Sequence, residues 1–277
     1  FDQGPGVAWA IRFGTALFGD TEFGVRFPAV VLTLLATVFV YLFMRRAANR
    51  AAAILSVILM NVVPLFSAGA LVLFYAIVKA VFWCAGLYCF WRALHDGTPG
   101  PESPAAAGPD GGPDPAALPG DPPVESIGTS APPANWGWWI LSGACVGLGF
   151  DAKYTMILFM PAVLTVLALD RSDRRRLLRP QPWAAALTAL LCVFPVLYWN
   201  ARNGWASVGW MAHQGNRPGK SLINPKYFFE LLGSQAGLVS PILFGLLVWR
   251  LVVDFKKGVL GGDRFRRFCV VFALWGG

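Results

Sequence analysis

Charged side chains are scarce in this sequence, and their scarcity excludes an ordinary soluble domain. They make up 14% of the 277 residues, whereas soluble globular proteins carry roughly 25%. Apolar residues reach 56%, and the mean hydropathy is +0.55. The few charges cluster between long apolar runs. Because a bilayer core of ~30 Å needs ~20 apolar residues for each crossing helix, this pattern indicates a chain that crosses a membrane several times.

Paired cysteines and histidine clusters are also missing. The cysteines stand singly inside apolar stretches, at Cys84, Cys89, Cys145, Cys192 and Cys269. No two of them have the spacing of a metal or redox motif, so we interpret them as small buried hydrophobic residues. The net charge is +8, but the basic residues flank apolar spans. Membrane topology therefore explains them better than nucleic-acid binding does.

The sequence has neither an initiator methionine nor the pattern of a signal peptide at its start. It begins at Phe1, and it ends at Gly277 within an apolar run. We therefore expect an incomplete copy of a longer protein.

The apolar runs predict an all-α, polytopic integral membrane protein. Residues 1–19 contain a run too short to cross, which suits a helix in the outer interface with Trp9 at headgroup depth. Membrane helices are predicted at about 27–44, twice within 51–94, at 183–198, at 227–248 and at the C-terminal end. The block 136–169 is broken at 151–154 into halves of ~15 residues, about 22 Å each. We expect that break to dip into the membrane or to face a polar cavity.

Three regions follow from this pattern. Residues 1–94 contain the first outer segment and three membrane helices. Residues 95–135 are rich in Pro, Gly and Ala, and their only charges are acidic apart from His95. They cannot bury enough apolar area to offset their ordering entropy, so they are predicted to form a disordered cytoplasmic loop. A proline-rich recognition tract is the alternative, but no basic or aromatic residue anchors it. Residues 136–277 contain the remaining membrane helices and a polar outer loop at 200–226.

The distribution of basic residues predicts an orientation. The turns after Met44, Trp91, Leu169 and Val248 contain 15 of the 23 Lys and Arg residues. The positive-inside rule places these turns in the cytoplasm. Residues 1–19, the break at 151–154 and the loop 200–226 then share the outer face.

Several polar residues are not explained by membrane crossing. Asp2 precedes a Gly/Pro turn, which can aim a carboxylate at a ligand; the alternative is a solvated loop acid. Asp151 and Lys153 place charge at membrane depth, where it is costly and normally serves a function. Lys153 and Tyr154 suit a lipid phosphate, because Lys153 would supply a positive charge and Tyr154 would donate a hydrogen bond. The alternative is a pair whose polar ends simply reach the membrane interface. Lys79 lies inside a predicted span, where it faces a cavity or marks a misplaced boundary.

The outer loop combines aromatic, amide and cationic side chains, namely Asn200, Trp205, His213, Arg217 and Lys226. This combination suits a sugar phosphate, because rings stack on the sugar while Arg and Lys bind the phosphate. Trp205 also fits the aromatic belt of an interface. His213 is interpretable as an acid/base group, a ligand or a surface histidine. With no cysteine or second histidine beside it, it does not indicate a metal site.

Six stretches form an ordered pattern along the chain. They are Phe1–Pro5, Ile11–Asp20, Gly24–Pro28, Gly147–Thr155, the Trp199–Trp205 loop and Asn224–Phe228. In order and spacing they resemble the bacterial glycosyltransferase family 39, relatives of the protein O-mannosyltransferases and the lipid A aminoarabinose transferases. One departure is Phe74-Tyr75-Ala76, where relatives carry a polar turn such as Thr-Pro-Asp.

The resemblance implies a GT-C fold with its active site in the first and later outer loops. An acidic residue there deprotonates or orients the acceptor, while cations hold the departing lipid phosphate. Asp2 is similar to the family's second acidic position in the first outer loop, so we take it as the candidate catalytic or assisting residue. The family's first acidic motif would lie upstream of Phe1, so we expect residues 1–277 alone to give no turnover.

The resemblance therefore predicts a glycosyltransferase of the bacterial inner membrane. It would move a hexose or pentose from a polyprenyl-phosphate donor to a lipid, glycan or protein at the extracytoplasmic face. The expected partners are the lipid-linked donor and membrane lipids, not nucleic acid. One alternative is a transporter or flippase of lipid-linked material, for which intramembrane charge is equally natural, although no inverted repeat is evident. The other is an inactive, truncated relative.

Overall fold

The computed structural model describes residues 4–63, 66, 75–95, 135–215, 226, 229–230, 233–234, 237, 240–260 and 263–276. Every regular element in these ranges is a helix, which confirms the all-α class. The elements are α1 (Gly6–Phe18), α2 (Glu22–Ala47), α3 (Arg50–Val62), α5 (Tyr75–His95), α6 (Trp136–Ala152), η2 (Tyr154–Leu158), α7 (Phe159–Leu169), α8 (Arg171–Arg174), η3 (Arg175–Leu178), α9 (Pro180–Arg202), α10 (Ala206–Gly215), α12 (Pro241–Phe255), η4 (Lys256–Leu260) and α13 (Arg264–Gly276).

Three described helices are long and apolar enough to cross a membrane: α2, α5 from Ala76 onward, and α9. Helix α2 is longer than predicted because both of its ends are stabilised. The Thr21 hydroxyl accepts a hydrogen bond from the Gly24 amide at 3.0 Å, and Arg45 and Arg46 lie in its last turn, where cations favour the helix dipole. A membrane-spanning helix therefore begins and ends at recognisable signals.

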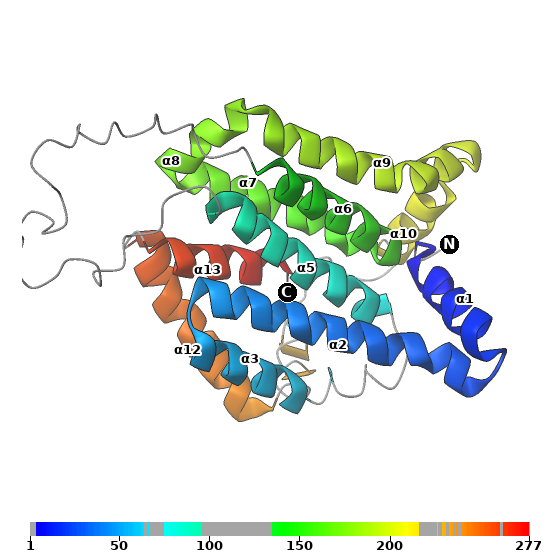
Figure 1. Ribbon diagram of the computed structural model, residues 1–277, viewed down its shortest axis with the longest axis horizontal. Coiled ribbons are helices and arrows are strands. Elements are labelled where there is room, and N and C mark those ends of the chain that lie inside the picture. The colour runs from blue at the N-terminus through cyan, green and yellow to red at the C-terminus, as the bar shows by residue number, and fades with distance from the viewer. Residues whose placement is uncertain are drawn as a thin grey trace, which may run out of the picture.

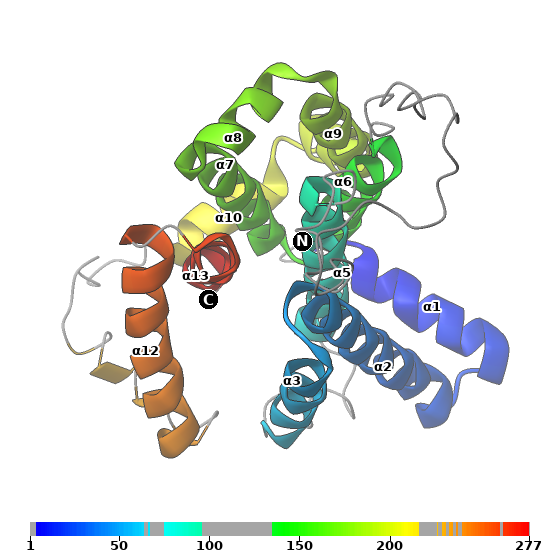
Figure 2. The ribbon, with the colours of Figure 1, turned by 60° about the vertical axis from the view of Figure 1, so that its left-hand side comes forward.

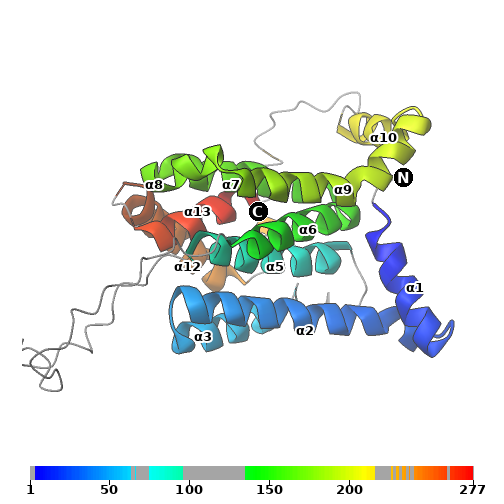
Figure 3. The same cartoon turned by 45° about the horizontal axis from the view of Figure 1, so that its top comes forward.

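Four helices form a row in the order α9, α6, α5 and α2 (Figure 3). Helix α5 lies between α6 and α2, with α3 beside α2 (Figure 2). Successive helices run in alternating directions through the bundle (Figure 1), as expected of a chain that crosses a membrane repeatedly. Helix α1 runs across one end of this row (Figure 3).

Helices α6 and α9 pack closely because small residues face each other. A Cβ atom added to Gly143 would lie 2.1 Å from the Ala185 carbonyl oxygen, and one added to Gly147 would lie 2.7 Å from that of Ala189. This small-residue spacing lets two helix backbones approach in a membrane, where van der Waals contact rather than the hydrophobic effect drives association. The pair α6–α9 therefore forms a fixed part of the bundle.

Aromatic rings fill the core between α5, α6, α7 and α13. The ring centres of the stacked pair Phe90 and Phe268 lie 5.8 Å apart, and those of Phe159 and Phe272 lie 4.9 Å apart. Trp139 meets Phe90 edge to face at 5.7 Å. Such ring pairs stabilise a fold by roughly 0.5–1.5 kcal/mol beyond the area they bury.

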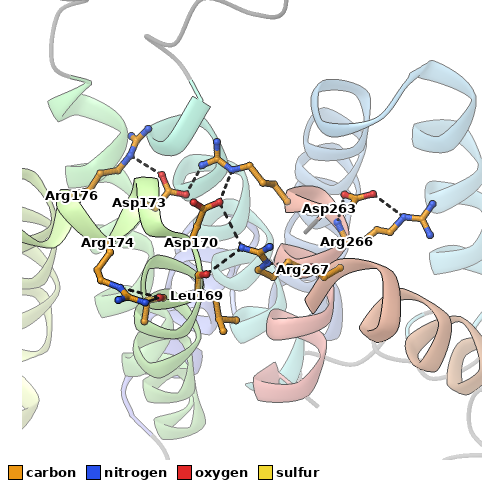
Figure 4. Close-up of polar contacts among 11 residues, drawn as sticks. Leu169, Asp170, Asp173, Arg174, Arg176, Asp263, Arg266 and Arg267 are labelled. Carbon is orange, nitrogen blue, oxygen red and sulfur yellow. Dashed lines mark hydrogen bonds and ion pairs between the residues drawn. The ribbon is translucent and has the colours of Figure 1, made fainter. Parts of the chain in front are cut away.

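Ion pairs join α13 to the turn after α7 (Figure 4). Arg264 pairs with Asp170 at 3.1 Å and with the buried Asp173. Arg176 approaches Asp173 at 2.9 Å, and Arg267 approaches Asp170 at 3.6 Å. Part of the basic cluster after Leu169 is thus neutralised inside the protein.

The basic turns gather at one end of the bundle. Phe43, near the end of α2, contacts Trp91 at the end of α5 and Phe265 at the start of α13. Arg176 in η3 donates to the Ala93 carbonyl at 3.5 Å. The N-terminal end of α1, the α6–η2 junction and α10 lie at the opposite end (Figure 1). In the described residues, the basic turns and these three segments therefore lie at opposite ends of the bundle.

Two predicted segments differ in detail from the described residues. Within the span expected at 227–248, residues 229–230, 233–234 and 237 are helical. Ser240, with φ of 84°, directly precedes helix α12, which begins at Pro241. The loop expected at 200–226 contains α10, and α9 continues through Arg202. The predicted disordered segment 95–135 lies outside the described residues except for His95 and Asn135.

Candidate functional site

The first outer segment packs against the break between α6 and η2. A Cβ atom added to Gly4 would lie 2.1 Å from the Asp151 carbonyl oxygen, and one added to Gly6 would lie 3.0 Å from Ala152 backbone atoms. Only glycine allows this approach of two backbones. The chain that leads into α1 is therefore fixed beside the backbone of Asp151 and Ala152.

The break itself is a single extended residue. Lys153 has φ of −153° and ψ of 125°, which ends α6, and its amide donates to the Gly149 carbonyl at 3.0 Å. Its carbonyl accepts from the Met156 amide at 2.9 Å, which starts η2. The polar residues predicted to interrupt this apolar block thus do interrupt it.

Asp151 occupies the last turn of α6 and is 1% exposed. Neither of its carboxylate oxygens has a hydrogen-bond partner among the described residues. An unpaired polar group of this kind costs about 1–3 kcal/mol of folding free energy. Such a cost is typical of a residue retained for a reason other than stability.

Asn200 shapes the corner between α9 and α10. Its side-chain amide donates to the Val196 carbonyl at 3.1 Å, and its side-chain oxygen accepts from the Ser207 amide at 3.2 Å. The Tyr154 hydroxyl donates to the Ser207 hydroxyl at 3.4 Å and so joins η2 to α10. Asn200 is buried; in this structure it positions α10.

The same corner contains a strained residue. Gly204 and Trp205 both adopt left-handed conformations, with φ of 62° and 57°. The Trp205 amide donates to the Asn200 carbonyl at 2.8 Å, while its side chain is 49% exposed. A left-handed non-glycine residue costs of order 1–3 kcal/mol and is found most often at functional sites. The strain is therefore evidence that the position of Trp205 matters.

These elements enclose a cavity of about 410 Å³ between η2, the end of α9 and α10, here called the outer cavity. Its walls are apolar and include Phe150, Ile157, Val196 and Met211. Tyr154, Asn200, Trp205 and Ser207 also line it. The site thus combines a largely apolar interior with a few polar groups, as ligand pockets commonly do.

A second lysine belongs to this end of the bundle. Lys79 lies in the first turns of α5, and its ammonium group sits 5.1 Å from the centre of the Trp83 ring. Helices α5 and α6 pack against each other, and Lys153 ends α6, so both lysines belong to this end of the bundle.

The remaining residues that the sequence predicted for the site are not found in the lining of the outer cavity. His213 on α10 is exposed and does not line the outer cavity, and no group of metal-binding side chains occurs in the described ranges. Lys226 is exposed and pairs with Glu230 at 3.7 Å. Asp2 and Arg217 lie outside the described residues.

Ser207 and the apolar wall of the cavity were not predicted from the sequence. Ser207 contacts a tyrosine 53 positions earlier, and no short motif encodes that contact. Phe150 and Met211 look like ordinary membrane-facing residues in the sequence. Only packing of the helices shows that they line one space.

Comparison with known proteins supports this description. The profile of a family described as dolichyl-phosphate-mannose-protein mannosyltransferase matches residues 2–100 and 130–199, which together exceed half of the chain. No solved structure matches the chain. The family match covers α1 to α7, including the break at Lys153, and most of α9. The chain therefore belongs to the dolichyl-phosphate-mannose-protein mannosyltransferase family, a family of GT-C membrane glycosyltransferases.

Proposed function

We propose that the protein moves a sugar from a polyprenyl-phosphate donor to a lipid, glycan or protein acceptor at the extracytoplasmic face of the bacterial inner membrane. The family description names a donor of this class, a sugar on dolichyl phosphate, and a protein acceptor. The outer cavity carries the proposal, because an isoprenoid chain needs apolar walls and its phosphate needs nearby cations.

The lipid part of the donor fits the apolar walls of the outer cavity. Phe150, Leu158, Val196 and Met211 face one continuous space of about 410 Å³. Burying apolar surface there stabilises a complex by roughly 25 cal/mol per Å². The first isoprene units of the donor would therefore bind with their phosphate directed toward the polar rim.

The cations of this end would hold the phosphate. Lys153 lies at the break beside the cavity, and Lys79 adds a second positive charge near it. Arg217 and Lys226, from the segment after α10, would add further charge. Tyr154 would donate a hydrogen bond, and the exposed Trp205 ring would stack on the sugar.

The transfer step follows from these positions. The acceptor oxygen attacks the anomeric carbon, and the bond between that carbon and the phosphate oxygen breaks. The electrons of the broken bond remain on the lipid phosphate, whose charge the lysines stabilise. Asp2, or His213 as a second acid/base candidate, would take the proton of the acceptor hydroxyl.

The orientation rests on charge. The turns after α2, α5 and α7, which carry basic residues, lie at the end of the bundle opposite α10 (Figure 1), and α10 helps to line the outer cavity. Because basic turns are retained in the cytoplasm, the cavity would open toward the outside, where polyprenyl-linked sugars meet their acceptors.

To test this proposal, the full-length protein in membranes is given radiolabelled polyprenyl-phosphate sugar, and transfer of the label to acceptors is measured. Asp2→Asn is expected to lower transfer by about 10²–10⁴-fold, the usual contribution of an acid/base group. Lys153→Gln should raise the donor KM. Arg12→Gln is the matched control, because Arg12 is an exposed cation on α1 at the same end.

Movement of label across the bilayer without a new glycosidic bond would contradict transfer and support a transporter. Equal activity of Lys153→Gln and Arg12→Gln would contradict the assignment of the phosphate site.

A further inference from the structure

A second cavity lies at the other end of the bundle. It measures about 220 Å³ and opens between α6, α7 and α9; we call it the α7–α9 slot. Buried Phe159, Leu167 and Ala189 form part of its lining. Leu164 and Trp183, also in the lining, are 54% and 67% exposed. The slot is thus a recess that faces away from the core, toward the surrounding lipid.

The slot extends from the basic end into the membrane. Its lining follows α9 from Pro182 to Ala189, a rise of about 10 Å at 1.5 Å per residue. That is roughly a third of a hydrocarbon core of ~30 Å. In a bilayer an apolar recess of this depth is filled by a lipid chain, because protein interiors and their surroundings leave few voids.

Two arginines lie close in sequence to the lining of the slot. Arg175 and Arg179 are each two positions from Leu177, a lining residue, and both are exposed. Neither side chain makes a hydrogen bond or ion pair with the part of the chain that the structure describes. Their neighbours differ: Arg174 donates to the Ala168 carbonyl at 2.7 Å, and Arg176 pairs with Asp173.

The corner around these arginines has the character of an interface. Leu178, between them, is 89% exposed. The Trp183 indole donates to the Leu177 carbonyl at 2.9 Å, which fixes the ring beside the slot. Exposed leucine and tryptophan beside arginines are typical of a segment at headgroup depth.

We infer that the α7–α9 slot binds one anionic phospholipid, with an acyl chain along α9 and its phosphate at Arg175 and Arg179. Charge complementarity selects the anionic headgroup, since guanidinium groups bind phosphate oxygens in a bidentate manner. The site is separate from the outer cavity and lies at the opposite end of α9, so it does not depend on the proposed sugar transfer. The bound lipid would fill the space between α7 and α9 and hold them together.

The first test measures thermal unfolding of the purified full-length protein after delipidation. Phosphatidylglycerol should raise the unfolding midpoint more than zwitterionic phosphatidylcholine does. Each arginine near headgroups contributes about fivefold to affinity, so Arg175→Gln/Arg179→Gln should weaken phosphatidylglycerol binding by about 25-fold. Arg45→Gln/Arg50→Gln is the matched control, because those exposed arginines lie at the same end but do not flank the slot.

A second test fills the slot. Ala186→Phe places a ring in the lining, whereas Leu187→Phe places it on the neighbouring, 57% exposed position. Native mass spectrometry should show phosphatidylglycerol retained by Leu187→Phe and lost from Ala186→Phe.

Three results would overturn the inference. They are equal midpoints with the two lipids, equal losses in the two arginine double variants, and wild-type retention of phosphatidylglycerol by Ala186→Phe. Because Arg175 and Arg179 are exposed, their replacement leaves the fold intact. The comparison of the two arginine double variants therefore tests lipid binding even if Ala186→Phe fails to fold.

Discussion

Two buried aspartates in this molecule have opposite surroundings. Asp151 has no hydrogen-bond partner for either carboxylate oxygen among the described residues. Asp173 forms ion pairs with Arg176 and Arg264, and its Oδ2 accepts a hydrogen bond from Arg264, although its Oδ1 accepts none of good geometry from the described residues. A buried polar group without partners costs folding free energy, and a buried pair becomes costly once one member is removed. Replacing these two aspartates should therefore change stability in opposite directions.

Asp151→Leu is expected to raise the free energy of unfolding by about 1–3 kcal/mol, the cost of an unsatisfied polar group. Asp173→Leu should lower it by about 3–5 kcal/mol, because two arginines lose a buried partner. Thermal unfolding of both variants in detergent measures the difference. A loss of stability in Asp151→Leu equal to that in Asp173→Leu would show that Asp151 has a structural partner.

Asn200 and Asn203 provide a second contrast within one corner. Asn200 is buried and joins α9 to Ser207, while the exposed side-chain amide of Asn203 donates to the Trp199 carbonyl within α9. Asn200→Leu should destabilise the protein by about 1–3 kcal/mol, because the Ser207 amide loses its acceptor. Asn203→Leu should change stability by less than about 0.5 kcal/mol. Limited proteolysis after residue 202 should increase only in Asn200→Leu.

At the scale of elements, the contact between α6 and α9 depends on glycine. Gly143 approaches Ala185 backbone atoms, whereas Gly137 on the same helix has open space where a Cβ would lie. Gly143→Ala should cost about 1–3 kcal/mol through overpacking. Gly137→Ala should be neutral or stabilising by up to about 1 kcal/mol through helix propensity. Similar unfolding midpoints for the two variants would contradict this packing.

Much of this element order was predictable from the sequence because hydropathy and polar interruptions carry it. The first long apolar helix, the short helix before it and the break at Lys153 follow from apolar run length and from charge within an apolar block. The presence of helix α10 was not predictable, because its ten residues lie between polar segments. The positive φ of Ser240 directly before α12 is likewise a feature that hydropathy does not encode.

The candidate site was predictable only in part, for a related reason. Lys153, Tyr154, Asn200 and Trp205 stand out in the sequence as polar or aromatic residues beside apolar runs. Their common cavity depends on contacts across more than 50 positions, such as that between Tyr154 and Ser207. Asp151 was suspected for its charge, but its complete burial requires the packing of α6 against its neighbours.

At the scale of the whole molecule, the basic turns and the outer cavity lie at opposite ends of the bundle. We expect a cysteine at Gly209 on α10, an open and exposed position, to react with a membrane-impermeant thiol reagent in intact cells. A cysteine at Arg175 should react only after the membrane is permeabilised, because basic turns stay in the cytoplasm. Reaction of both cysteines from the same side would contradict the proposed orientation.

The central claim is that the outer cavity holds the lipid of a polyprenyl-phosphate sugar. The most direct measurement is photo-cross-linking of the full-length protein with a polyprenyl phosphate that carries a reactive group near its phosphate. We predict cross-links within residues 150–158 and 205–211, and unlabelled polyprenyl-phosphate sugar should compete with them. Cross-links confined to other segments, or unaffected by the competitor, would contradict the claim.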